Sequence, residues 1–223
     1  MGKFLQKNHI VPAVWPVDFN DATPTCDYVS MKNYKHLTIH IMLATAGGTS
    51  AVTVSQAKDV AATGAKTLAF IEYLMSGSKW KFTGKSAADF AVGETVTGAG
   101  GASGVVYEVG ADYLLLYTVN ATAVVDAETL TGGTSGATAT ANGIGVNEDI
   151  MLPLACVNTF TMPAVVNKCY AIEIEASMLD LTNDFDCVAV AIVDPGAAML
   201  GSVVYVLSEP RYKGIPMETA IYD

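Results

Sequence analysis

The sequence predicts a mainly β protein: a β-sandwich whose chain is interrupted by a small inserted β module. Apolar and polar residues alternate along residues 34–43, which is the pattern of a strand with one buried face. No segment has the 3.6-residue periodicity of a long amphipathic helix. Residues 81–145 also differ in texture from the rest of the chain, because Gly, Ala and Thr crowd them.

Further strands are predicted in short runs rich in β-branched and aromatic residues, at 52–55, 65–73, 170–176, 187–193 and 202–207. Turn-forming pairs, Asn183-Asp184 and Pro195-Gly196, separate the last three runs. Such runs occur on both sides of residues 81–145, so residues 1–80 and 146–223 are predicted to form one discontinuous host domain. An insertion of this kind is tolerated at an exposed loop, and Gly77 and residues 143–145 are the predicted junctions.

The predicted module contains a two-fold internal repeat. Gly93-Glu94-Thr95-Val96-Thr97-Gly98 is echoed by Ala127-Glu128-Thr129-Leu130-Thr131-Gly132. A Ser-Gly pair follows each copy, first Ser103-Gly104 and then Ser135-Gly136. Each copy is predicted to form a β-hairpin with a Gly-rich turn, and residues 107–119 between them are typical of a buried strand. Two copies are too few for a solenoid, so a compact module is expected.

The charge balance argues against several classes of partner. Twelve Lys and Arg stand against 22 Asp and Glu, which gives a formal charge of −10, and only 15% of residues are charged. Nucleic-acid binding needs clustered cations, and only Lys79, Lys81 and Lys85 come close together. No apolar run approaches the roughly 18 residues that span a bilayer, and no signal peptide begins the chain. We expect no nucleic acid and no membrane as partner, and synthesis in a cytoplasm.

Motifs for phosphate binding and nucleophilic catalysis are incomplete. Residues 83–86 end like a phosphate-binding loop, but the position where that loop needs its first glycine is Lys79. The elbow pattern G-x-S-x-G fails around Ser103 and Ser135, because its last glycine would fall at Val105 and Ala137. We therefore expect that the protein is not an enzyme and needs no cofactor.

Metal binding is also disfavoured. On a strand, His36 and His40 share a face but lie about 13 Å apart, too far to hold one ion. Asp180, Asn183, Asp184 and Asp186 favour a turn, with calcium as the alternative. The sequence has no C-x-x-C pair, and its four cysteines are predicted to be buried thiols without disulfides: Cys26, Cys156, Cys169 and Cys187.

Several stretches of the host domain carry a resemblance: residues 27–34 (DYVSMKNY), 57–60 (AKDV), 64–70 (GAKTLAF), 172–186, which begins IEIEA, and 205–212. They resemble a family of tailed-bacteriophage virion structural proteins. The repeated Gly-Glu-Thr-Val-Thr-Gly unit is similar to small β modules of phage structural proteins. The resemblance implies an assembly role, and we expect an accessory capsid protein of the decoration or cement type, located in the virion after synthesis in the host bacterial cytoplasm.

Such a protein is expected to bind the major capsid protein and copies of itself, as a homo-oligomer with a trimer favoured. The apolar, Pro-containing residues 11–16 are predicted to be an arm laid on a neighbouring subunit; the alternative is an irregular segment that covers its own core. The candidate interface residues are Val11, Val14, Trp15, Tyr113 and Tyr117.

Two other functions stay open. The chain could be a tail or neck component, which would form rings or tubes by itself. It could also be a glycan-binding module of the virion surface, with Trp80, Tyr107, Tyr113 or Tyr117 stacking on host sugars.

Overall fold

The computed structural model describes residues 4, 7–20, 26–117, 119–120, 122–143 and 145–211, with only the backbone at 146–149. The chain divides into two compact units, Met1–Leu74 with Leu154–Asp223 and Met75–Pro153, here named the sandwich unit and the inserted module. This division differs from the boundaries predicted at residues 80/81 and 145/146. It falls inside two long strands that pair with each other, β6 (Glu72–Thr83) and β12 (Val146–Ala155). Gly77, expected at a junction, lies inside β6.

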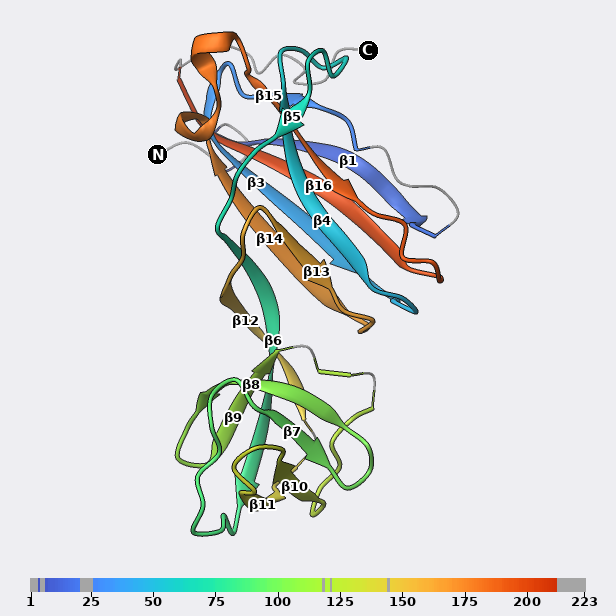
Figure 1. The fold of residues 1–223 in the computed structure, drawn as a ribbon, viewed down its shortest axis with the longest axis vertical. Coiled ribbons are helices and arrows are strands. Elements are labelled where there is room, and N and C mark those ends of the chain that lie inside the picture. The colour runs from blue at the N-terminus through green and yellow to red at the C-terminus, as the bar shows by residue number, and fades with distance from the viewer. Residues whose placement is uncertain are drawn as a thin grey trace. The chain divides into compact units, whose positions relative to one another are not determined.

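The sandwich unit consists of two antiparallel sheets, so the prediction of a mainly β chain with a sandwich is confirmed (Figure 1). The first sheet contains, in spatial order, β1 (His9–Asp18), β16 (Leu200–Pro210), β3 (Tyr34–Leu43) and β14 (Lys168–Glu175). The second contains β13 (Thr159–Met162), β4 (Ser50–Ala57), β15 (Cys187–Ile192) and β2 (Val29–Ser30), with β5 (Lys66–Thr67) beside β4. Two 3-10 turns, η2 (Ala176–Met178) and η3 (Leu181–Asn183), lead from β14 to β15.

The alternation along β3 explains how the first sheet packs. Leu37, Ile39 and Ile41 are fully buried, whereas the residues between them face outward. Ile39 pairs with Ile172 of β14 on one side and with Tyr205 of β16 on the other. The hydroxyl of Tyr205 accepts a hydrogen bond of 3.0 Å from the backbone N–H of Val190 on β15, which joins the two sheets.

One strand prediction in this unit is wrong. Residues 65–73, expected to form a single strand, contribute only the short β5 and the beginning of β6. Between them, Leu68 and Phe70 insert into the core, while Ile71 is exposed. The backbone between β5 and β6 therefore forms no strand, because it turns these two large apolar side chains into the core.

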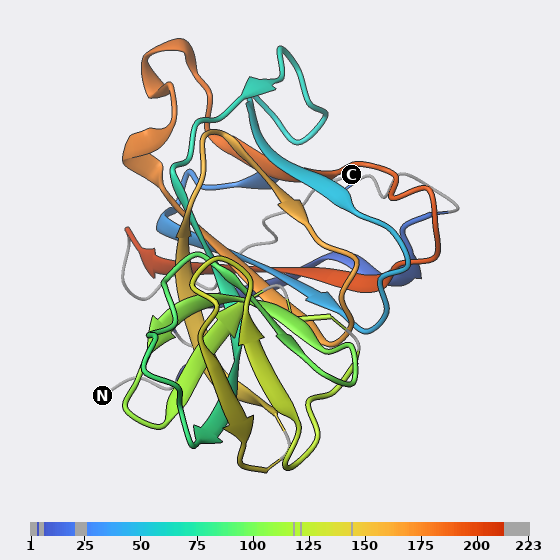
Figure 2. The ribbon, with the colours of Figure 1, turned by 60° about the horizontal axis from the view of Figure 1, so that its bottom comes forward.

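The inserted module is a closed antiparallel sheet. From β6 the strands follow one another as β11 (Thr138–Ala141), β10 (Thr129–Gly132), β7 (Thr95–Gly98), β8 (Ser103–Val109) and β9 (Tyr113–Tyr117), and β9 pairs with β6 again (Figure 2). Apolar side chains fill its interior: Trp80, Phe82, Phe90, Val96, Ala102, Val106, Leu114, Leu116, Val124, Leu130, Ala137, Ala139 and Ala141. Closure leaves the module without an unpaired sheet edge over these strands.

Both predicted hairpins form, β7 with β8 and β10 with β11, and the two copies of the motif pair with each other through Thr97 and Thr131. The two Ser-Gly pairs, however, are not equivalent. Ser103 begins a strand and pairs with Thr97, whereas the partner of Thr131 is Thr138 and Ser135 lies in the preceding turn. The second turn, from Gly132 to Ala137, is one residue longer than the first, from Gly98 to Ala102.

The glutamate of each copy completes the turn of the other copy. The Glu94 carboxylate accepts hydrogen bonds from the backbone N–H groups of Thr134 (3.0 Å) and Ser135 (2.9 Å) and from the Ser135 hydroxyl (2.8 Å), and from Ala91 N–H (2.7 Å) in its own turn. The Glu128 carboxylate accepts from Gly100 N–H (2.9 Å) and from Val125 N–H (3.2 Å). We name these contacts the reciprocal turn caps.

Desolvation by itself would raise the pKa of Glu94, but the hydrogen bonds from Ser135, Ala91 and Thr134 outweigh it, so the pKa of this carboxyl lies below its ordinary value. The caps also explain two glycines. A Cβ at Gly132 would lie 2.7 Å from Glu94 Oε1, and a Cβ at Gly98 would collide with Glu128 Oε1.

Candidate interaction surface

The N-terminal segment is a strand of the sandwich and is not a free arm. β1 pairs antiparallel with β16, with Val11 opposite Tyr205. Val11 and Ala13 are buried against their own sheet. This segment is therefore not a free arm. The alternative is confirmed in part, because the segment covers its own core, although it does so as an edge strand with two register shifts.

β1 forms the edge of its sheet, and its backbone is irregular there. The register shifts between Pro12 and Val14 and again between Val14 and Val17. Proline has no backbone N–H, and bulges interrupt the regular ladder that a further strand would need. Sheet extension at this edge is thus disfavoured, and contacts would have to use side chains.

Three neighbouring strands present an outer face without charge. In spatial order these are β1, β16 and β3, and residues 9–17, 200–208 and 36–43 contain no Lys, Arg, Asp or Glu. We name their outward-facing residues the uncharged face: Ile10, Pro12, Thr38, His40, Met42, Leu200, Ser202, Val204 and Val206.

The register places these side chains in rows across the strands. Ile10 lies beside Val206, and Val204 lies between Pro12 and His40. Ile10, Met42 and Leu200 are 45%, 48% and 45% exposed, so a substantial part of this apolar surface contacts water in the isolated chain. Solvent-exposed apolar patches of this kind mark interaction sites on soluble proteins.

The edge beside this face carries the most exposed tryptophan of the described chain. Trp15 is 75% exposed, its neighbour Val17 is also exposed, and Val14 is half-buried. Tryptophan is enriched among the residues that dominate interface energetics. Of the candidate interface residues in this unit, Trp15 is thus fully available, Val14 partly, and Val11 is not.

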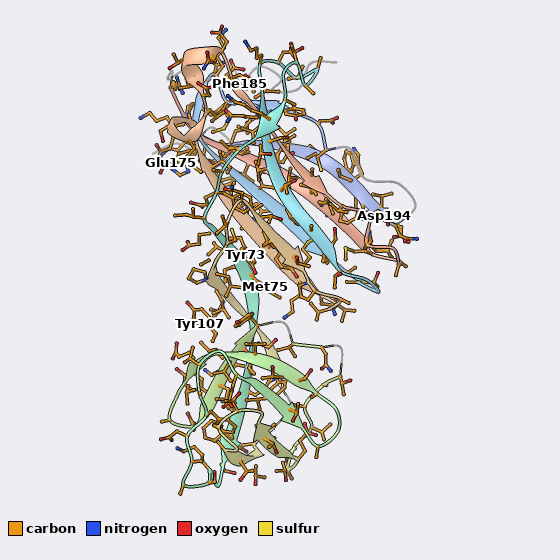
Figure 3. The ribbon with its side chains drawn as sticks, viewed as in Figure 1. Tyr73, Met75, Tyr107, Glu175, Phe185 and Asp194 are labelled. Carbon is orange, nitrogen blue, oxygen red and sulfur yellow. The ribbon has the colours of Figure 1, made fainter. Side chains whose placement is uncertain are left out.

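Carboxylates lie at the rim of the uncharged face, with Asp18 beside Leu200 on one side and two glutamates along β14 on the other. Glu173 and Glu175 are exposed there, and His36 Nε2 lies 3.6 Å from Glu175 Oε1. Glu175 and Phe185 lie toward the end of the sandwich that carries η2 and η3, and Asp194 lies toward the other end (Figure 3). Burial lowers the pKa of His40, and the nearby Glu173 carboxylate opposes this in part. His40 therefore adds no charge to the face near neutral pH.

The other candidate interface residues, Tyr113 and Tyr117, belong to the inserted module and form a separate surface. Both are half-buried on β9. The Tyr113 hydroxyl donates a 2.8 Å hydrogen bond to Glu108 Oε1, and Lys79 Nζ lies 4.4 Å from the centre of its ring. Trp80, considered for sugar stacking, is buried in the module core and is not accessible to a ligand.

The polar groups of the motifs that suggested phosphate or metal binding pair with neighbouring residues of the chain. Ser86 exchanges hydrogen bonds with Thr138, its N–H donating to the Thr138 carbonyl and its hydroxyl accepting from Thr138 N–H, and Lys85 pairs with Asp89. Asn183 Nδ2 donates to both carboxylate oxygens of Asp180 at 2.9 Å, so this acidic cluster forms a turn as predicted.

Within the described residues, no group of three or more His, Cys, Asp or Glu side chains is placed to hold a metal ion. None of the four cysteines, all of them described, forms a disulfide. Burial raises the pKa of the Cys26 thiol to about 12, and burial together with Asp186 does the same for Cys187. These two thiols therefore carry almost no thiolate near neutral pH.

Open hollows lie among the described residues of the sandwich unit, and two of them bring ionisable groups together. One, of ≈ 260 Å³, is lined by Glu72, Glu173, Glu175 and His36 among others. The second, of ≈ 360 Å³, combines three cations with two carboxylates: Lys32, Lys58, Arg211, Asp184 and Asp186. Mixed signs at such short range suit neither a simple anion nor a simple cation.

Comparisons of the chain with protein-family models, with curated proteins and with solved structures give no match. In the part of the chain that the structure describes, no helix has the length and apolar character needed to cross a membrane. A functional proposal for this protein depends on its own residues, and the uncharged face is the strongest surface feature among them.

Sequence reasoning missed this face, although part of its signal was present. The runs free of Lys, Arg, Asp and Glu are visible in the sequence, but they are far apart along the chain. Only the strand order brings them side by side.

Proposed function

We propose that this protein is an accessory capsid protein of a tailed bacteriophage, which attaches to the assembled shell through protein–protein contacts and stabilises it. The uncharged face of the sandwich unit carries the proposal. Interface cores are depleted in charged residues and enriched in aromatic ones, and this face combines an uncharged surface with the exposed Trp15 at its edge.

A protein of this kind stabilises a shell by mass action. Anything that binds the assembled state and not the separated subunits shifts the equilibrium toward assembly, by an amount set by its concentration relative to its Kd. A two-sheet sandwich and a closed module suit this task because folded units lose less conformational freedom on docking than disordered segments do. The proposed role therefore depends on binding alone.

Cosedimentation with empty capsids of the encoding phage tests the proposal. The purified chain should pellet with assembled shells and should stay in the supernatant with unassembled capsid protein. Shells that carry the chain should also come apart at a higher temperature than bare shells. Failure to pellet with shells, or location of the chain in the tail by cryo-electron microscopy of the virion, would contradict the proposal.

A further inference from the structure

We propose that the uncharged face is the docking surface for a second copy of this chain, so that two sandwich units pair face to face about a twofold axis. This inference goes beyond the proposed function, since it concerns the free protein and requires no capsid. It names a second copy as the partner of the uncharged face, so that in a dimer the contacts with a shell would be made by other surfaces of the chain.

Charge selects a second copy as the occupant. With a net charge of −10, two copies repel each other over most approaches. The uncharged face is the exception, because residues 9–17, 200–208 and 36–43 place no Lys, Arg, Asp or Glu opposite a second copy of themselves. The nearest carboxylates lie at the rim, where water can still screen them: Asp18, the register partner of Leu200, on one side, and Glu173 and Glu175 of β14 on the other.

The area of the patch is sufficient for a dimer. The exposed parts of Ile10, Met42 and Leu200, together with Trp15 at the edge of the face, sum to roughly 400 Å² if an aliphatic side chain offers somewhat less than the 150–250 Å² of an aromatic one. A twofold contact buries this patch on both copies, about 800 Å² in all, and the remaining outward-facing residues bring it toward the roughly 1,000 Å² expected of a specific interface. The half-exposed Val204 and Val206 add to it.

The geometry favours packing of faces over joining of edges. Pro12 and Pro16 and the two register shifts of β1 prevent a regular ladder at the open edge. A second sheet laid on the outer face needs no backbone hydrogen bonds and covers apolar side chains on both sides. A face that pairs with itself closes at two copies, so the proposal replaces the trimer favoured by the sequence with a dimer.

Sedimentation equilibrium of the full-length chain, over concentrations up to about 100 μM, tests the proposal. The wild-type chain should show the mass of a dimer. Met42→Asp and Ile10→Asp each place a charge in the contact and should weaken dimerisation at least about tenfold, since interface residues in a desolvated centre commonly have effects of that size. Val157→Asp is the matched control, because Val157 is 78% exposed in the same unit but lies outside the face, and it should remain dimeric.

All three substitutions are at exposed sites, so the circular dichroism spectra should match wild type, and thermal unfolding should match it at dilutions where the wild-type dimer dissociates; agreement in both excludes misfolding as the cause. A monomeric or trimeric wild-type mass overturns the proposal, as does a dimer that persists in Met42→Asp combined with Ile10→Asp. Capsid cosedimentation is measured separately. A monomer that pellets with shells refutes this inference alone, and a dimer that does not pellet refutes only the proposed function.

Discussion

Replacement of Glu94 with alanine should destabilise the inserted module more than replacement of Glu128. Glu94 accepts four hydrogen bonds and Glu128 accepts two among the reciprocal turn caps. Both side chains are buried in the folded chain. Removal of the carboxylate leaves the backbone N–H groups that donate to it without their hydrogen-bond partner.

The size of the effect follows from these bonds. A hydrogen bond to a charged group contributes about 1.5–3 kcal/mol, and water recovers part of this where the donor is exposed. Thr134 is exposed and Ser135 is half-buried, so water replaces some of the loss. We expect Glu94→Ala to lower the free energy of unfolding by about 3 kcal/mol and Glu128→Ala by about 1.5 kcal/mol.

Urea unfolding followed by tryptophan fluorescence measures this difference. Trp80 is buried in the module core, and the second tryptophan, Trp15, can be removed by Trp15→Phe because it is exposed. With a slope of about 1.5 kcal/mol per molar urea, the Glu94→Ala midpoint should fall by about 2 M. An equal or smaller effect than that of Glu128→Ala would refute the reasoning from the caps.

Three further predictions concern single groups. Because the pKa of Glu94 is lowered in the folded chain, the stability that its carboxylate contributes is complete above the ordinary pKa of 4.5 and is lost as the pH falls below that value. Glu94→Gln should remove this acid sensitivity from the urea unfolding curve followed by Trp80 fluorescence. Gly132→Ala should cost about 1–3 kcal/mol in urea unfolding, because its Cβ meets the Ser135 hydroxyl and the Glu94 carboxylate that are hydrogen-bonded to each other. Gly93→Ala has nothing nearby but a φ of +85°, so it should cost about 1 kcal/mol. In an NMR titration, His40 should have a pKa below 6.5, and Glu173→Gln should lower that pKa further; a rise would contradict the assigned cause.

Local patterns predict the strands that alternate. The clean alternation of residues 34–43 gives β3 with its observed bounds, and the two Gly-rich motifs give both hairpins. The sequence also contains the signal that buries Trp80, since Lys79 and Lys81 flank it in a strand. Alternation succeeds in these places because one face of each strand is buried and the other is wet.

Strand order and edge positions could not be read in the same way. The prolines of residues 11–16 suggested a free arm, but an edge strand tolerates proline on its unpaired side. The uncharged face depends on the neighbours of β16, which are β1 from the beginning of the chain and β3. Such long-range pairing leaves no local mark, so a single sequence locates the uncharged runs but not the surface that they form.

The exchange of glutamates inside the module has a consequence for how it can change. Since Glu94 closes the loop after β10 and Glu128 closes the loop after β7, neither hairpin has a finished structure in the absence of its twin. We therefore expect the two hairpins to unfold together, and the removal of one hairpin to destabilise the other. A substitution in one motif should therefore disturb the turn of the other motif first.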